Sequence, residues 1–261
     1  MSKFKFLAFF LIPFISMYIL TGCSDKEQVV ITSIEQLHDK SFGIPTGTVA
    51  DKLILSVFPG AKFKYFNSVL DSVIAVKQGK VDAAAYDEPI LRNIAAKNSG
   101  LTVLPEKITT DNYGYAVSLD NGSLKATIDN TLNELKTNGE YDAMVKRWLP
   151  KEGSPKPMLE IEVGTNGVLR FGTSAVTEPF SFVDGSGKVV GLDIEIAARV
   201  AKKLNKKLEI VNMEFGSMIP ALISNKVDMI GACITITEER SKKVLFSESY
   251  YTGGISAIVR N

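Results

Sequence analysis

The chain has 261 residues and a formal charge of +1, with 30 Lys and Arg against 29 Asp and Glu. This balance leaves no basic surplus to neutralise phosphates, so we expect no nucleic-acid partner. His38 is the only histidine, which excludes Ser-His-Asp and Cys-His catalysis in their usual form and disfavours a histidine-based zinc site. We therefore expect no metal and no cofactor.

The N-terminus predicts a lipoprotein signal peptide. A short basic start precedes an apolar run at 6–20, whose 15 residues are fewer than the roughly 20 that a membrane span needs. The run ends in Leu-Thr-Gly-Cys, which resembles the motif cut by lipoprotein signal peptidase, with the thiol of Cys23 taking the lipid. An ordinary signal peptide with a chance cysteine is the alternative. We expect residues 1–22 to be removed and residues 23–33 to form a tether, with the lipid as the sole membrane anchor.

Beyond the tether, strand and helix signals alternate along the chain. Short apolar runs predict strands at 41–44, 81–86, 113–118, 169–174, 227–233 and 255–260. Helical periodicity predicts helices at 49–58, 69–78, 123–137, 140–148, 192–204 and 217–224. The alternation predicts an α/β fold with helices packed on sheets, rather than a sandwich or a helical bundle.

Two stretches share a pattern that indicates two lobes of similar construction. SVIAVKQGKVDAAAYD (72–87) and MIPALISNKVDMIGAC (218–233) each contain a helix, a polar turn, Lys-Val-Asp and an apolar strand. Ordinary repetition of βα units is the alternative explanation. Between the two stretches, 150–167 is rich in Pro and Gly, which is typical of a linker.

Residues at the ends of predicted strands are candidates for ligand binding, because open α/β sheets bind ligands beyond the carboxyl ends of their strands. Asp87 follows the strand at 81–86 and would accept a cation, or alternatively cap the next helix. Arg240 lies in the first turn of a helix, where the dipole disfavours a cation. It would hold a carboxylate bidentately or pair with a nearby acid. The turn at Thr48 opens a helix and offers free N–H groups to an anion.

Asp87 would therefore bind a cation, whereas Arg240 and the turn at Thr48 would each bind an anion. Together these three sites suit a zwitterion. Phe215 lies between a strand and a helix, and is either a core residue or a wall for an apolar ligand surface. The sequence has no nucleophile–base pair, Walker loop, GxGxxG motif or metal-ligand spacing. A binding protein is therefore a better interpretation than an enzyme.

These segments resemble the extracytoplasmic solute-binding proteins of polar amino-acid ABC importers (family 3). Residues 169–204 are similar to the opening strand, Pro-Phe motif and first helix of that family, and 213–251 to its next stretch. Residues 41–48 and 79–89 resemble its second lobe, and 113–150 its return to the first lobe and its C-terminal end. The resemblance implies a two-lobed type II (Venus-flytrap) fold, with a mixed sheet flanked by helices in each lobe.

The order of the segments is rotated relative to the family, which implies a circular permutation. The second lobe would span 34–110, the returning segment of the first lobe 111–150, a linker 151–167 and the first lobe 168–261. The lobes would then be joined only near 105–116. A fragment of a longer tandem or permease-fused protein, and domain swapping between two chains, are the alternatives.

The resemblance implies roles for residues that bind the ligand's charged groups. Arg240 would hold the α-carboxylate, helped by Thr235 and by the N–H groups of Thr48 and Val49. Asp87 would take the α-ammonium. Closure of the lobes would bury the zwitterion between these groups.

The remaining implied roles concern the rest of the pocket. The carbonyl of Cys233 would assist with the ammonium, Phe215 would form an aromatic wall, and Ser174 and Thr177 would line the side-chain pocket. Many cationic-amino-acid binders of the family carry an acid and an aromatic residue at the last two positions. Their absence favours a neutral or small polar amino acid, although Glu178 lies nearby.

The implied function is extracytoplasmic binding of an amino acid-like ligand and its delivery to the permease of an ABC transporter. A sensory lipoprotein that signals to a membrane partner is one alternative. A dehydratase-like enzyme on the same fold is another, and Glu178 is the acid that it would use.

Overall fold

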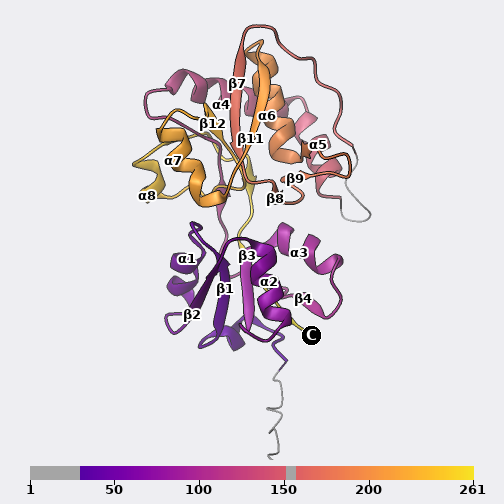
Figure 1. Ribbon diagram of the computed structural model, residues 1–261, viewed down its shortest axis with the longest axis vertical. Helices are drawn as coiled ribbons and strands as arrows, with labels where there is room; N and C mark the ends of the chain where they lie inside the picture. Colours follow the sequence, from indigo (N-terminus) through magenta and orange to yellow (C-terminus); the bar gives the residue numbers. More distant parts are fainter. Residues whose placement is uncertain (1–29, 151–156) are drawn as a thin grey trace, which may run out of the picture.

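The computed structural model describes residues 30–150 and 157–261, which form two lobes stacked along the long axis of the molecule (Figure 1). The predicted signal peptide, Cys23 and most of the tether lie outside the described residues. Within those ranges, no helix combines the length and apolar character that a membrane crossing requires. The predicted fold class, an α/β fold with a mixed sheet in each of two lobes, is confirmed.

The second lobe, at the bottom of Figure 1, is built on a five-stranded sheet in the order β2-β1-β3-β15-β4. Strands β1, β2 and β3 run parallel, whereas β15 is antiparallel to both of its neighbours, β3 and β4. The strands are β1 (Ser41–Pro45), β2 (Lys62–Phe66), β3 (Ala83–Asp87), β4 (Leu101–Val103) and β15 (Ile255–Arg260). Its helices are η1 (Ile34–Leu37), α1 (Ala50–Val57), α2 (Val69–Lys77) and α3 (Glu88–Ala96).

Helices cover both faces of this sheet, and β3 is therefore buried along its whole length. Ala83 and Ala85 pack in the cluster that contains Ile54 of α1. Ala84 and Tyr86 pack in the cluster that contains residues of α2 and α3. Small side chains on β3 thus let helices approach both sides, as expected for a central strand of a largely parallel sheet.

The first lobe is built on a second five-stranded sheet, in the order β11-β7-β12-β6-β13. Its strands are β6 (Ala116–Val117), β7 (Val168–Thr173), β11 (Lys207–Asn212), β12 (Met229–Ile230) and β13 (Leu245–Phe246). A small sheet of β8 (Val176–Thr177), β9 (Ser181–Val183) and β10 (Val189–Val190) lies beside it. The helices are α4 (Gly122–Thr137), α5 (Glu140–Trp148), α6 (Leu192–Lys203), η2 (Phe215–Ser217), α7 (Met218–Ile223) and α8 (Glu238–Ser241).

Segments from both sides of residues 151–156 build the first lobe together. Strand β6 lies between β12 and β13, although more than 110 residues separate β6 from either of them in the sequence. Helix α5 packs against α6, where the fully buried carboxylate of Glu195 accepts hydrogen bonds from Arg147 and Trp148. The first lobe therefore requires both halves of the chain.

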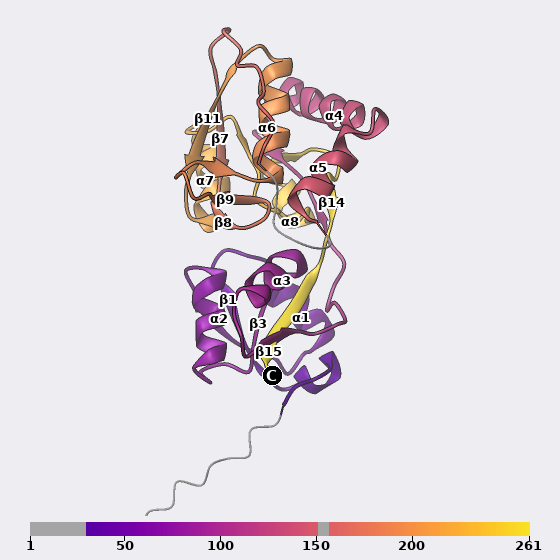
Figure 2. The same cartoon turned by 90° about the vertical axis from the view of Figure 1, so that its right-hand side faces the viewer.

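The end of the chain differs from the predicted boundaries. The sequence analysis placed all of 168–261 in the first lobe, but β15 pairs with β3 and β4 of the second lobe. Figure 2 shows this yellow strand running down among the indigo and purple elements. Five of its six residues are buried, so its apolar pattern gives no sign of the sheet that it joins.

The prediction that the lobes are joined only near 105–116 is consequently wrong. In the described part of the chain, one connection runs from β4 to β5 (Asn112–Tyr113) and another from β14 (Tyr251–Thr252) to β15. Strands β5 and β14 pair antiparallel, with Tyr113 opposite Tyr251. The two connections thus form a short ribbon between the lobes.

Candidate ligand-binding site

A small cavity of about 20 Å³ lies between the lobes. It brings together seven of the nine residues predicted to bind ligand: Thr48, Val49, Asp87, Phe215, Cys233, Thr235 and Arg240. Ala50, Tyr86 and Ile255 complete its lining and were missed from the sequence, where all three read as ordinary core residues. The lining comes from both lobes, so the cavity exists only when they are closed on each other.

Asp87 supplies a buried carboxylate at the carboxyl end of β3. Although it occupies the N-cap position of α3, its side chain makes no capping hydrogen bond and instead accepts one from the Tyr113 hydroxyl. Burial raises the pKa of Asp87 to about 7, against the opposing effects of the Tyr113 hydrogen bond and the Arg240 charge. The nearby charge of Asp111 raises that pKa further.

Arg240 supplies a buried cation from α8 in the other lobe. It is 8% exposed, and its guanidinium donates to the carbonyls of Thr235 at 3.0 Å and Gly47 at 3.3 Å. The guanidinium lies 5.5 Å from the ring centroid of Phe215, a cation–π contact. Burial lowers the pKa of Arg240 from its ordinary value, and the charge of Asp87 opposes that shift.

The sequence left open that Arg240 forms an ion pair with a neighbouring acid, but the two acids beside it pair with lysines instead. In the described ranges, Glu238 pairs with Lys242, and Glu239 pairs with Lys52 of the second lobe. Neither acid forms an ion pair with Arg240 in those ranges. The guanidinium bonds only to neutral carbonyl oxygens in the described residues, so it can also receive a carboxylate.

Cys233 has a left-handed backbone, with φ of 52°, three residues after the end of β12. Its N–H donates to the Tyr250 hydroxyl at 3.3 Å, which fixes this unusual conformation. Burial raises the pKa of its thiol above the ordinary value, which favours the neutral form of the sulfur.

Two predicted pocket residues lie outside the cavity lining. The hydroxyl of Thr177 is 3.1 Å from the carbonyl oxygen of Ser174 and 3.2 Å from that of Ser181. Ser174 and Thr177 are both buried within the first lobe. Glu178 forms an ion pair with Lys97 of the second lobe at 2.5 Å.

Within the described ranges, no cluster of three or more His, Cys, Asp or Glu could hold a metal ion.

Residues 169–261 match the family model described as bacterial extracellular solute-binding proteins, family 3. The arginine-binding extracellular protein ArtP of Bacillus subtilis is 44% identical over 84 residues, which are 32% of this chain and 32% of ArtP. The L-cystine-binding protein TcyJ of Escherichia coli is 33% identical over 99 residues, 38% of this chain and 37% of TcyJ. The chain thus spans about a third of the length of these curated relatives.

Solved structures of arginine-binding proteins are also similar in sequence. The arginine-bound form of domain 1 from TmArgBP is 41% identical, covering 36% of this chain and 81% of that chain, with a TM-score of 0.33. An ancestral arginine-binding protein bound to glutamine is 50% identical, and the match covers 33% of this chain and 39% of that chain with a TM-score of 0.32. Residues 169–261 are thus similar to the bacterial extracellular solute-binding proteins of family 3.

Proposed function

We propose that the protein binds a small amino acid-like zwitterion between its lobes, outside the cytoplasm, and delivers it to the permease of an ABC transporter. One observation carries the proposal: the interlobe cavity has a buried carboxylate, Asp87, from one lobe and a buried guanidinium, Arg240, from the other. The names of similar proteins, which bind arginine, cystine or histidine, support an amino acid as the ligand.

The charges explain how binding would drive closure. A ligand α-carboxylate would bond to the Arg240 guanidinium, and its α-ammonium would bond to Asp87. Each charged group costs several kcal/mol to bury unless it is paired, so a ligand that pairs both favours the closed state. Because the two groups belong to different lobes, a ligand held by one lobe would recruit the other.

We further propose that the ligand has a neutral or small polar side chain. The cavity is small in the closed state, and Glu178, the acid nearest to the predicted side-chain pocket in sequence, already pairs with Lys97. A ligand with a cationic side chain would have to break that pair or find another acid. Seating any amino acid also requires the lobes to open and close again around it, since about 20 Å³ holds little more than a water molecule.

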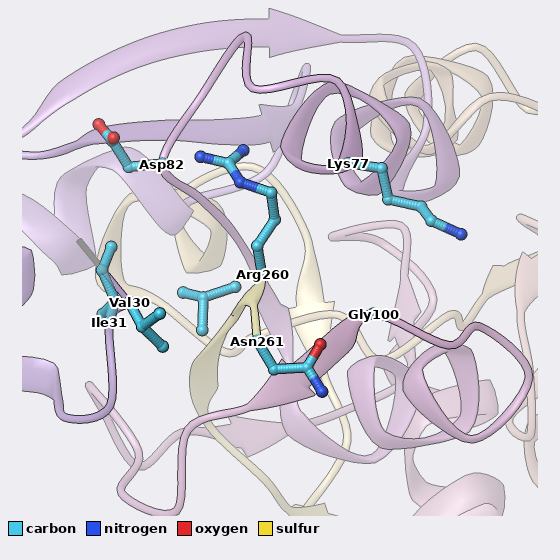
Figure 3. A pocket seen from close by; sticks show the side chains of 8 residues that line it. Val30, Ile31, Lys77, Asp82, Gly100, Arg260 and Asn261 are labelled. Atoms are coloured by element: carbon cyan, nitrogen blue, oxygen red, sulfur yellow. The ribbon is translucent and has the colours of Figure 1, made fainter. Parts of the chain in front are cut away.

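The rotated order of the segments is proposed to be a circular permutation. In support, the first and last described residues of the chain lie together in the second lobe, at a cavity of about 480 Å³ far from the site (Figure 3). Val30 and Ile31 line it together with Val259, Arg260 and Asn261. A relative with the family order would join such segments directly and would break the chain near residues 151–156 instead.

The proposed lipid anchor at Cys23 would hold the protein at a bacterial membrane without a membrane-spanning helix. Substituting Cys23 by Ser should release the protein from the membrane fraction of expressing cells. A substituted protein that remains in the membrane fraction would contradict a lipid anchor.

The binding proposal is tested by thermal unfolding of residues 24–261 against each of the twenty amino acids. A ligand at 100 times its Kd should contribute about 2.7 kcal/mol of stability, which is readily seen as a shift in Tm. A clear shift with one or two amino acids is the expected result. A cooperative transition that none of the twenty shifts would exclude an amino acid and redirect the search to other zwitterions.

A further inference from the structure

The hydroxyl of Tyr113 lies between the proposed ammonium acceptor and both connections between the lobes. It donates a hydrogen bond to Oδ1 of Asp87 and accepts one, 3.0 Å long, from the N–H of Gly254. Tyr113 itself belongs to β5, in the first connection, while Gly254 lies in the second. A single phenol group therefore touches Asp87 and links the two connections.

The surroundings hold the Tyr113 ring in one position. The side chain is fully buried, and its ring stacks on that of Tyr251 with centroids 6.0 Å apart. A Cβ at Gly253 would lie 2.3 Å from the Tyr113 hydroxyl oxygen, so any other residue there would displace the ring. The carbonyl of Gly254 in turn accepts the N–H of Glu88, the residue after Asp87. Hydrogen bonds thus connect Asp87 to Tyr113, Tyr113 to Gly254, and Gly254 back to the residue that follows Asp87.

We propose that Tyr113 is a positioning residue for the ligand and a coupler between the site and the hinge. By donating to Oδ1, it orients the Asp87 carboxylate and leaves Oδ2 for the ligand's ammonium. Its bond to Gly254 ties that orientation to the ribbon on which the lobes would move. The inference rests on the proposed function, because it assigns Tyr113 to the site in which Asp87 would bind an ammonium.

Several titratable groups act on Asp87, and their effects set what a change at Tyr113 should do. Burial and the charge of Asp111 raise its pKa, whereas Tyr113 and Arg240 lower it. Tyr86, Cys233, Asp193 and Tyr251 also interact electrostatically with Asp87. Loss of the Tyr113 hydroxyl should therefore raise the pKa of Asp87, an effect that packing alone does not produce.

The test compares Tyr113→Phe with Tyr115→Phe in the full chain. Tyr115 is an equally buried tyrosine whose hydroxyl donates to the carbonyl of Asp193 at 3.1 Å, within the first lobe. Two quantities are measured from about pH 5 to about pH 9: the affinity for the amino acid found in the thermal screen, and the titration of Asp87 without ligand. The titration is followed by NMR of ¹³C-labelled aspartate carboxyls and assigned with Asp87→Asn.

Tyr113→Phe is expected to bind at least about tenfold more weakly at pH 7, as for a lost hydrogen bond to a charged group. Its Asp87 titration should move to higher pH, and the loss of affinity should shrink as the pH rises. Tyr115→Phe should match the wild-type protein in both measurements. In a second variant, 3-fluorotyrosine at position 113, the more acidic phenol should shift the Asp87 titration to lower pH with the ring preserved.

Two results would overturn the proposal. One is an Asp87 titration that is moved neither by Tyr113→Phe nor by 3-fluorotyrosine at position 113. The other is a loss of affinity in Tyr113→Phe that is equal at every pH. A wild-type protein that binds none of the twenty amino acids would exclude an amino acid as the ligand, which is a failure of the proposed ligand class and not of the role of Tyr113. The titration of ligand-free Asp87 would still decide whether Tyr113 controls that carboxylate. If Tyr113→Phe does not fold, the fluorinated variant decides the question by the direction of its shift.

Discussion

Gly47 of the second lobe and Gly216 of the first lobe meet through their backbones: a Cβ at Gly47 would lie 2.7 Å from the Cα of Gly216. The carbonyl of Gly47 also accepts a hydrogen bond from Arg240. Gly47→Ala should therefore hold the lobes apart and weaken ligand binding at least about tenfold, because no flexible side chain can yield at this contact. Isothermal titration calorimetry with the amino acid from the thermal screen measures the loss.

Gly47 also has a φ of +82°, so alanine there is strained even in an isolated lobe. Gly187→Ala provides the matched control, because Gly187 has a φ of +80° and nothing within 4 Å of its added Cβ. It should lose a similar small amount of stability and bind as wild type. Equal affinities in Gly47→Ala and the wild type would show that the ligand-bound lobes do not approach this closely.

The ion pair between Lys97 and Glu178 joins the lobes at another point of their interface. Lys97→Glu places two acids there and should weaken ligand binding by up to about fivefold, the scale of a partly exposed ion pair. The double reversal Lys97→Glu/Glu178→Lys should restore most of the affinity. Both effects should fade at high salt, since the side chain of Lys97 is 55% exposed.

The control for this reversal is Lys125→Glu, which disrupts an ion pair with Asp129 inside helix α4. That pair does not cross the lobe interface, so its reversal should leave ligand affinity unchanged. If the double reversal binds no better than Lys97→Glu alone, the interlobe pair makes no contribution to closure.

Part of the site follows from the sequence because of how parallel strands end. Asp87 directly follows the apolar run at 83–86, and Arg240 occupies a helical turn where the dipole disfavours a cation. Each observation is local and uses only a few neighbouring residues. The structure brings both side chains to one cavity, as these local signals indicate.

Other features depend on contacts that no local pattern encodes. The sheet chosen by β15 depends on pairing with strands more than 150 residues earlier in the sequence. The segment YGYAVS does not identify Tyr113 as a site residue, because the hydroxyl of Tyr113 bonds to Asp87 and Gly254, which are distant in sequence. Ser174 and Thr177 were placed in the pocket by resemblance, whereas their hydrogen bonds in this closed structure are internal to the first lobe.

The two charged residues of the cavity should be indispensable for binding. Arg240→Ala and Asp87→Ala are each expected to lower affinity at least about tenfold, because each leaves one buried charge of the ligand unpaired. Arg240→Lys should also bind more weakly than wild type, since an ammonium cannot make the bidentate contact of a guanidinium. Calorimetry measures the affinities, with exposed Arg92 of α3 substituted by Ala as the control. Unchanged affinity in either alanine variant would refute the assignment of the site.

Asp193 should make the ligand-free protein less stable as the pH rises. Burial raises its pKa to about 7, well above the value of about 3.9 for an aspartate in an unfolded chain. The folded state therefore holds more protons between these values, and its stability is lost as the pH rises through 7. Asp193→Asn, which stays neutral, should reduce the fall in Tm between about pH 5 and about pH 8.

Asp228 offers a control of opposite sign. Burial raises its pKa, but the hydrogen bonds from Arg170 and the charges of Arg170 and Lys206 together lower it below the ordinary value. Asp228→Asn should therefore cost stability above the unfolded pKa and leave the decline through pH 7 in place. Thermal unfolding curves at several pH values measure both variants. An identical pH profile in Asp193→Asn and the wild type would show that the Asp193 carboxyl does not titrate with folding.

Glu195 should contribute strongly to the stability of the first lobe, because it joins the segment before residue 151 to the segment after residue 156. Its fully buried carboxylate accepts hydrogen bonds from Arg147 at 2.7 Å and from the indole of Trp148 at 2.7 Å. These partners come from the half of the chain before residue 151, and Glu195 comes from the half after it. Glu195→Ala leaves a guanidinium and an indole N–H buried without their acceptor, and should cost about 3–5 kcal/mol.

Urea unfolding measures this loss, with Glu134→Ala as the matched variant. Glu134 of α4 pairs with Lys203 of α6 across the same group of helices, but its side chain is 64% exposed. Its loss should cost no more than about 1 kcal/mol. If Glu195→Ala were equally mild, α5 would be held by apolar packing alone. If it unfolded in two separate transitions, the halves before and after residues 151–156 would be independent folding units, and a single first lobe built from both would be wrong.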